Sequence, residues 1–148
     1  MKIQIEIEPI IFNPTFIDLG LPSGNLWSSE NVPGYYTYEE SLKFKGVPRF
    51  IDFAELIEYC TWVWDKEKNG QIAIGPNGNS IFFPANGFYN KENVEFENTK
   101  DAGYYWSLKP VHDESAHSFV VTHKYVTMGA GERYTHQFSV RLVINPRR

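Results

Sequence analysis

The hydrophobic positions between residues 50 and 60 recur with the period of a helix. Four apolar side chains fall at i, i+3, i+4 and i+7 and therefore share one face: Phe53, Leu56, Ile57 and Cys60. Asp52 and Glu55 have the spacing of a capping box, which predicts a helix over residues 52–60. An alternative start lies at Arg49, directly after a proline. In both cases the apolar face needs a packing partner.

After this helix the pattern changes to the period of two that is typical of strands. Trp62 and Trp64 begin it, and apolar runs at 72–74 and 80–84 continue it. Asparagine–glycine pairs favour tight turns, and they separate these runs at Asn69-Gly70, Asn77-Gly78 and Asn86-Gly87. We therefore expect one helix on an aromatic-rich antiparallel sheet. Three side chains are predicted to be buried there: Cys60, Trp62 and Ile81.

The flanking segments carry weaker patterns. Ile3, Ile5 and Ile7 alternate with polar residues and predict an N-terminal strand with one buried face. Thr37 and Glu40 have a second capping-box spacing, which predicts a short helix over residues 38–44. The polar, acidic stretch 90–101 is expected to be an exposed loop.

The C-terminal third of the chain is predicted to form a hairpin. Residues 116–126 alternate between apolar and polar side chains, as a half-buried strand does. The segment Gly129-Ala130-Gly131 is expected to be its flexible connection, because glycine gives the backbone the most freedom. Residues 133–143 are then the returning strand. Tyr104-Tyr105-Trp106 predicts a further strand before the hairpin.

Length, charge and cysteine content exclude several classes of protein. A chain of 148 residues is expected to be a single domain, 1–148. The formal net charge of −4 and the scattered basic residues argue against nucleic-acid binding. No apolar run approaches the about 18 residues of a membrane span, and the N-terminus lacks the apolar core of a signal peptide. The single cysteine, Cys60, excludes an internal disulfide framework and favours a core thiol.

One long motif is specific enough to indicate a family. It reads Asp-Leu-Gly-Leu-Pro-Ser-Gly-Asn-Leu-Trp at 18–27. Further matching segments follow in order at 55–64, 77–87, 103–107 and 138–141. With these segments, the sequence resembles the Fibrobacter succinogenes major paralogous domain, which is abundant in Bacteroidetes proteins. The resemblance covers residues 16–143.

The resemblance implies an α+β, C-type-lectin-like fold: one or two short helices on antiparallel sheets, with paired N- and C-terminal strands. It makes the strand with Ile3, Ile5 and Ile7 a partner of the one with Phe138, Val140 and Leu142. It also places ligand-facing side chains on loops and strands near the C-terminal end. The candidate ligand- or partner-binding residues there are Lys109, His123, Lys124, Tyr125, Arg133, Tyr134 and His136. Tyr125, Arg133 and Tyr134 are residue types that often anchor interfaces.

Catalytic and metal chemistry finds little support in the sequence. The spacing of His117, His123 and His136 matches no specific metal geometry, and neither a metal nor another cofactor is expected. The acidic triplets of calcium-dependent sugar-binding lectins are absent, and so is the cysteine chemistry of formylglycine-generating enzymes. Adjacent carboxylates such as Glu39 and Glu40 do not set a glycosidase pair. Each of the four tryptophans lies inside a matched element, which favours the core over a sugar platform.

These observations predict a non-enzymatic binding or structural module. The preferred interpretation is a virion surface component of a Bacteroidetes phage: a fibre, decoration or receptor-contacting protein. The alternative is a bacterial surface adhesin domain that binds carbohydrate or protein, and an enzyme is a third, less supported class. The expected partners are other virion or surface subunits or a cell-surface glycan, and homo-oligomerisation is left open. The expected location is accordingly the virion or, alternatively, the bacterial cell surface.

Overall fold

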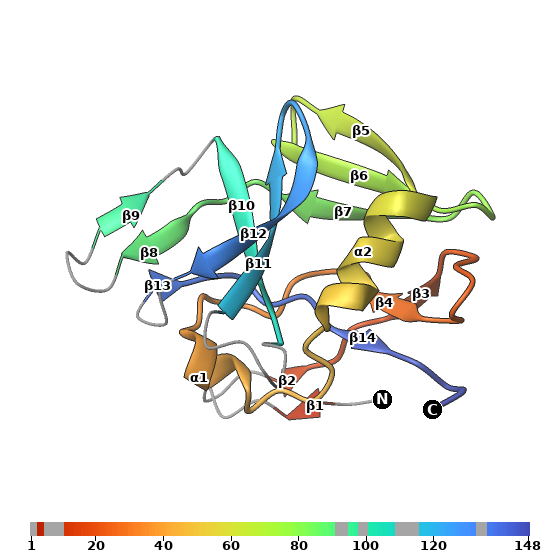
Figure 1. Ribbon diagram of the computed structural model, residues 1–148, viewed down its shortest axis with the longest axis horizontal. Helices are drawn as coiled ribbons and strands as arrows, with labels where there is room; N and C mark the ends of the chain where they lie inside the picture. The colour runs from red at the N-terminus through yellow and green to blue at the C-terminus, as the bar shows by residue number, and fades with distance from the viewer. Residues whose placement is uncertain (1–2, 5–10, 91–94, 98–100, 109–115, 133–135) are drawn as a thin grey trace.

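The computed structural model shows a mixed α+β fold made mostly of antiparallel strands, as predicted (Figure 1). It describes residues 3–4, 11–90, 95–97, 101–108, 116–132 and 136–148. Two helices occur in these ranges, α1 (Tyr38–Ser41) and α2 (Phe50–Tyr59). The strands are β1 (Ile3–Gln4), β2 (Ile11–Phe12), β3 (Phe16–Asp18), β4 (Leu26–Ser28), β5 (Thr61–Asp65), β6 (Gly70–Ile74), β7 (Ser80–Pro84), β8 (Phe88–Asn90), β9 (Glu95–Glu97), β10 (Ala102–Ser107), β11 (Ala116–Thr122), β12 (Val126–Glu132), β13 (His136–Gln137) and β14 (Val143–Ile144). Neither helix is long and apolar enough to cross a membrane.

Helix α2 begins at the alternative start. Arg49 is its N-cap residue, and the Asp52 carboxylate accepts a hydrogen bond from the Arg49 backbone N–H at 2.9 Å. The predicted capping box of Asp52 with Glu55 is therefore wrong, because Glu55 bonds to Ser23 in a distant loop. The predicted apolar face is confirmed, with Phe53 and Leu56 fully buried.

The three strands after α2 form the predicted meander, with β6 between β5 and β7. Asn69 adopts a left-handed φ of 59° at the first turn, and Gly78 one of 89° at the second, so the first two of the three predicted asparagine–glycine turns are confirmed. Strand β7 covers the predicted run 80–84. Its Phe83 and Ile81 face the core, while Ile72 and Phe82 lie on the opposite side of the sheet, where they are half-buried.

The predicted C-terminal hairpin exists, but its turn was placed wrongly. Strand β11 ends at Thr122 and β12 begins at Val126, so the connection is short. The segment Gly129-Ala130-Gly131 lies inside β12, where Gly129 pairs with Ser118. The reason is local. The Thr122 hydroxyl accepts hydrogen bonds from the backbone N–H groups of Lys124 and Tyr125, and these bonds form a turn directly after Thr122, before the predicted position.

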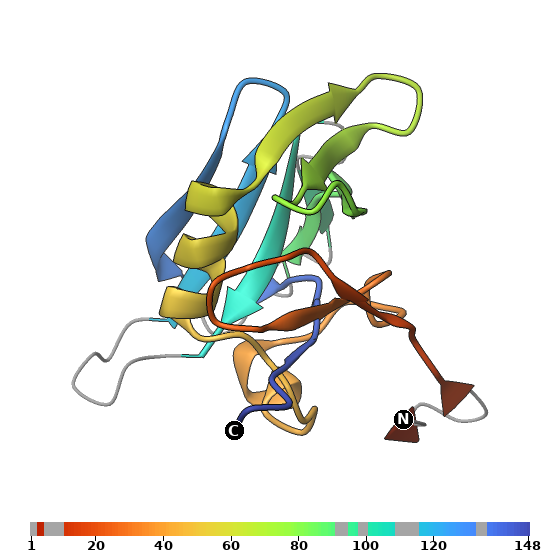
Figure 2. The same cartoon turned by 90° about the vertical axis from the view of Figure 1, so that its right-hand side faces the viewer.

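The predicted pairing of the terminal strands is also wrong in the described residues. Ile3 pairs with Phe12 through β1 and β2, while Ile5 and Ile7 lie outside the described residues. Segments 28–36 and 138–142 bond to one another instead, for example through the Val32 N–H and the Val140 carbonyl at 2.9 Å. Strand β14 then pairs with β4. In Figure 2, β1 and β2 lie at the edge of the molecule, apart from the C-terminal residues.

The sheet β10–β11–β12 separates two hydrophobic clusters. Tyr105 and Phe119 pair across one face and pack under α2, in a cluster that also holds Trp27 and Phe83. Trp106 points to the other face and stacks on Phe138 with ring centroids 4.2 Å apart. This alternation follows from the period of two in a strand. It places α2 and the β5–β7 meander on one side of the sheet (Figures 1 and 2).

Most predictions for individual core residues are confirmed. Cys60 and Ile81 are buried, and Trp27 and Trp106 are completely so. The prediction that Trp62 is buried is wrong, because this side chain is only partly buried. Its strand β5 is an edge of its sheet, which leaves one side of the indole uncovered. The first helix is confirmed with its Thr37–Glu40 capping box, but it ends at Ser41 and is shorter than predicted.

Candidate functional site

The turn of the β11–β12 hairpin presents three of the predicted binding residues together. His123, Lys124 and Tyr125 are exposed there, with Tyr125 at 55%. Hydrogen bonds to Thr122 hold their backbone in place: the Thr122 hydroxyl accepts hydrogen bonds from the N–H groups of Lys124 and Tyr125 at 3.2 and 3.1 Å. The Gln71 side chain of β6 also donates to the Thr122 carbonyl at 2.7 Å. The backbone of the turn is therefore held by hydrogen bonds, while its side chains remain accessible.

Aromatic side chains of the neighbouring strand β5 extend this site. The ring of His123 lies edge-on to Trp64, with centroids 6.1 Å apart. Trp62 and Trp64 are partly buried against the first hydrophobic cluster. We call His123, Lys124, Tyr125 and Trp64 the tip site. It combines two large rings with one ammonium group and one imidazole.

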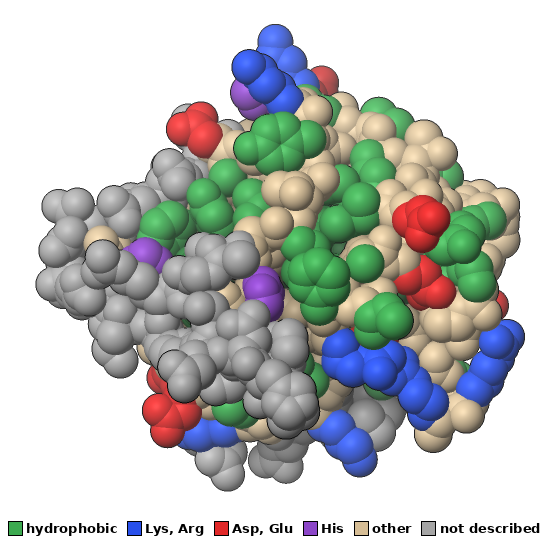
Figure 3. All heavy atoms as spheres, viewed as in Figure 1, with side chains coloured by type: hydrophobic (Ala, Val, Ile, Leu, Met, Phe, Trp, Pro, Cys, Tyr) green, Lys and Arg blue, Asp and Glu red, His purple; other side chains and the backbone are tan. Residues whose placement is uncertain are grey.

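An apolar strip continues from the tip site along α2 and β12. Phe50 and Ile57 fall on the same flank of the helix at i and i+7, and α2 packs against β12. Val126 and Met128 of β12 are partly buried beside them. Phe50 is 43% exposed. Figure 3 shows hydrophobic side chains gathered between the helix and the hairpin on this face, with basic and histidine side chains at the hairpin end.

His136 does not join the tip site. It lies on β13, which pairs with β8, away from the hairpin turn (Figure 1). Its ring packs on Phe88 at 4.9 Å and beside Phe138 at 6.1 Å, in the second hydrophobic cluster. The prediction that His136 shares a surface with His123 is therefore wrong. Its partly buried imidazole packs against core aromatics.

The remaining predicted site residues cannot be placed. Lys109, Arg133 and Tyr134 lie outside the described residues. The hairpin that was predicted to turn at residues 129–131 has its turn between Thr122 and Val126, and its strand β12 ends at Glu132.

The three histidines of the metal alternative lie in separate aromatic contacts. His117 faces Phe50 at 5.6 Å, His123 faces Trp64, and His136 faces Phe88. Among the described residues, no three side chains of His, Cys, Asp or Glu come together in a group suited to a metal ion.

The ionisable groups near α2 are engaged in holding the fold. Glu55 accepts from the Ser23 hydroxyl at 2.7 Å and from its N–H at 2.9 Å. Asp52 accepts from Arg49 and Asn25. Burial, with a smaller effect of Glu55, raises the pKa of the Cys60 thiol to about 11, so this thiol stays neutral near pH 7. None of these groups combines a free nucleophile with a neighbouring base.

Sequence reasoning missed Trp64 and Phe50 as parts of this surface. Trp64 lies in a segment that the sequence predicts correctly and was assigned to the core because large apolar side chains usually are buried, whereas Phe50 lies just before the predicted helix 52–60 and was not assigned to a face. No spacing signal marked Phe50 as exposed, because it lies three residues before Phe53 and seven before Ile57 and so continues the apolar stripe. Exposure of Trp64 depends on β5 being an edge strand, which the local pattern does not reveal.

The comparisons with known proteins give no relative: no family model, no curated protein and no solved structure matches the chain.

Proposed function

We propose that this chain is a non-catalytic binding module that contacts a protein partner through the tip site. The observation that carries the proposal is the exposure of Tyr125 and Lys124 on a turn that Thr122 and Gln71 hold in place, where the neighbouring His123 ring lies against Trp64. Tyrosine and tryptophan provide large contact areas at low entropic cost, and they dominate the energy of many interfaces. An ordered turn also loses little entropy on binding.

The chemistry of the surface favours a partner with apolar and acidic groups. Ile57 and Met128 supply apolar area on the tip side of α2, and Phe50 extends this strip toward the first turn of the helix. Lys124 and His123 supply donors and positive charge at its end. Apolar side chains that remain partly accessible beside polar ones are found at many interaction sites. A cell-surface glycan is the second candidate, because Tyr125 and Trp64 offer rings on which a sugar could stack.

The setting proposed for this module is the surface of a phage virion, with a bacterial surface adhesin as the alternative. Support comes from the family resemblance of residues 18–27 and not from any relative. The finer fold class, C-type-lectin-like, belongs to the same proposal. It is supported by two short helices on antiparallel sheets. Mass spectrometry of phage particles from a strain that carries the gene would test the virion setting.

Binding to intact Bacteroidetes cells tests the tip site. Labelled wild-type protein is compared with a Lys124→Ala/Tyr125→Ala double variant and with Leu42→Ala. Leu42 is a matched control, because it is 49% exposed but lies at the end of α1. We expect the double variant to bind about tenfold or more weakly, as loss of an interface anchor does. The control should bind like the wild type.

Two treatments of the cells identify the partner class. Protease treatment should abolish binding if the partner is a protein, whereas periodate oxidation should abolish it if the partner is a glycan. Melting temperatures of all variants are measured alongside, to confirm that they fold. A double variant that folds and binds with unchanged affinity would refute the tip site.

A further inference from the structure

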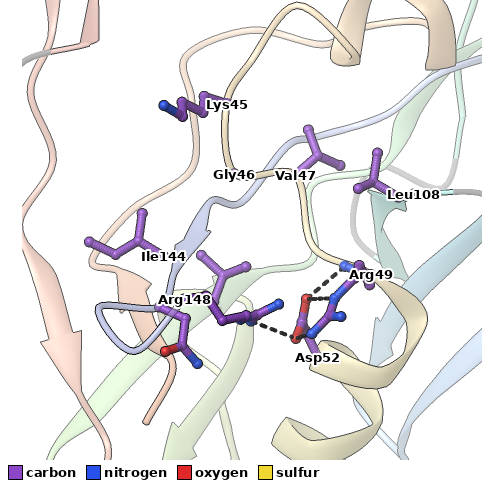
Figure 4. Close-up of a pocket in the computed structure, with 10 residues that line it drawn as sticks. Lys45, Gly46, Val47, Arg49, Asp52, Leu108, Ile144 and Arg148 are labelled. Carbon is purple, nitrogen blue, oxygen red and sulfur yellow. Dashed lines mark hydrogen bonds and ion pairs between the residues drawn. The ribbon is translucent and has the colours of Figure 1, made fainter. Parts of the chain in front are cut away.

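A cleft at the other end of α2 from the tip site combines an apolar wall with positive charge. Its volume is about 370 Å³, close to the lower end of the range for small-molecule sites. Its lining residues come from the loop before α2, the first turn of α2, the end of β10 and the C-terminal segment: Lys45, Gly46, Val47, Arg49, Asp52, Leu108, Val143, Ile144, Asn145 and Arg148. Figure 4 shows Arg49 and Arg148 converging on Asp52.

The two arginines approach one buried carboxylate. Arg49 donates from Nε to Asp52 Oδ2 at 3.2 Å and from Nη2 to Oδ1 at 3.0 Å. Arg148 Nη2 approaches the same Oδ1 at 3.6 Å. The Asp52 side chain is only 5% exposed, whereas those of Arg49 and Arg148 are 50% and 47% exposed. The carboxylate thus holds the Arg49 guanidinium, Arg148 is held beside it by a hydrogen bond from its Nη2 to Asn25 Oδ1 at 3.0 Å, and about half of each arginine side chain faces the solvent.

Positive charge exceeds negative charge along the lining. Lys45, Arg49 and Arg148 are cationic, and Asp52 is the one acidic side chain among the lining residues. Asp52 also accepts a hydrogen bond at Oδ1 from the Asn25 side chain, at 3.1 Å, in addition to those from Arg49. The N-terminus of α2 contributes further partial positive charge. An anionic group is therefore the complement of this rim.

The apolar part of the lining determines what the rest of the ligand must be. Val47, Leu108, Val143 and Ile144 make it apolar. The backbones are held close there, because the Val143 N–H donates to the Gly46 carbonyl at 2.8 Å. Gly46 has a φ of 103°, and a Cβ at this position would lie 2.8 Å from the Val143 carbonyl oxygen. The wall is thus a fixed surface against which an apolar group can pack.

We propose that this cleft binds a ligand that carries a carboxylate next to an apolar group, with the carboxylate on Arg49 and Arg148 and with Lys45 adding positive charge to the rim. Arginine forks match the geometry of a carboxylate, which favours this anion. A fatty acid and a peptide C-terminus with an apolar last residue share this chemistry. The proposal is independent of the tip site, since the two sites lie at opposite ends of α2.

Calorimetric titration of the full chain tests the cleft with four probes: octanoate, octan-1-ol, inorganic phosphate and N-acetyl-leucine. Octanoate or N-acetyl-leucine should bind more tightly than the other two. The better of these two carboxylates identifies a fatty acid or a peptide end as the source. Octanol or phosphate binding as tightly as both carboxylates would overturn the proposal, because charge and apolar contact are required together.

Three single variants locate the binding. Lys45→Gln and Arg148→Gln remove exposed cations of the rim. Arg148→Gln should weaken carboxylate binding by about three- to tenfold, as loss of a half-exposed charged contact does, and Lys45→Gln should weaken it less. Lys124→Gln removes an exposed lysine at the tip site and should change nothing. Equal weakening in all three, or unchanged binding in both rim variants, would overturn the assignment. Thermal unfolding verifies that each variant is folded.

Discussion

A full positive charge lies in the interior of the protein at Arg141. Its guanidinium donates to the Asn31 side chain at 2.8 Å and to the carbonyls of Ser28 and Phe82, and it lies 4.3 Å from the centre of the Phe83 ring. Burial lowers the pKa of Arg141 to about 10, against a smaller favourable effect of Tyr105. The charge is therefore costly in itself, and its bonds to two separate segments, 28–31 and β7, make it a cross-link of the fold.

Replacing Arg141 by methionine is expected to lower the free energy of unfolding by about 2–4 kcal/mol, because three buried oxygens lose their donor. Urea denaturation at pH 7 measures the change. Arg147→Met is the matched control on the surface and should cost less than about 1 kcal/mol. Equal stability of Arg141→Met and the wild type would mean that the cost of burying the charge cancels its hydrogen bonds.

The ionisation of Asp52 makes the stability of the protein depend on pH. Burial by itself would raise the pKa of Asp52, but the hydrogen bonds from Arg49 and Asn25 outweigh burial and lower it below 3.8. A carboxyl group with a lowered pKa in the folded state stabilises the protein above its ordinary pKa, and this contribution is lost as the pH falls through the folded pKa. The window is therefore below about pH 4.

The expected result is that Asp52→Asn destabilises the protein by about 1–2 kcal/mol at pH 7, a modest value because the arginines are half exposed to solvent. The difference from the wild type should shrink as the pH falls below 4. Urea midpoints at pH 7, 5 and 3 measure it. A difference that stays constant across this range would show that the charge of Asp52 is not the source of the stabilisation.

The β11–β12 hairpin depends on a single hydroxyl group at its turn. Thr122 Oγ1 accepts hydrogen bonds from the backbone N–H groups of Lys124 and Tyr125. Thr122→Val keeps the shape of the side chain but removes these acceptors, so it is expected to cost about 1 kcal/mol and to loosen the turn. Thr122→Ser retains the hydroxyl and serves as the control.

Hydrogen exchange at the amides of Lys124 and Tyr125 should be faster in Thr122→Val and unchanged in Thr122→Ser. Binding through the tip site should weaken in parallel, because an ordered turn is part of that proposal. Unchanged exchange in the valine variant would mean that the strands alone define the turn.

We expect the two hydrophobic clusters to unfold together as one cooperative unit, and Trp106 tests this expectation. It is completely buried, it stacks on Phe138, and its indole N–H donates to the Tyr36 carbonyl at 2.6 Å. It therefore links the central sheet to two distant segments. Trp106→Ala is expected to cost about 3–5 kcal/mol, as truncation of a large buried ring does.

Chemical denaturation monitored by fluorescence and by circular dichroism measures this loss, with Leu42→Ala as a surface control. The two probes should give one coincident transition in both variants if the clusters unfold together. A cost under about 1 kcal/mol for Trp106→Ala would contradict its place at the centre of the second cluster.

Local periodicity and turn chemistry determined much of the fold from the sequence. The apolar stripe of α2, the first two asparagine–glycine turns and the extent of β7 were predicted correctly. These features depend on neighbouring residues only, and their preferences are strong enough to decide the local structure. The burial of Cys60 and Trp106 follows from the same patterns.

Only the tertiary structure decided which segments pair and which side chains remain exposed. Segment 28–36 pairs with 138–142 in place of the predicted N-terminal strand, and Trp64 is partly open at the edge strand β5. The cleft joins Lys45, Arg49 and Arg148, which no spacing in the sequence connects. Strand pairing and the positions of edges depend on contacts between distant residues, so one-dimensional patterns do not contain them.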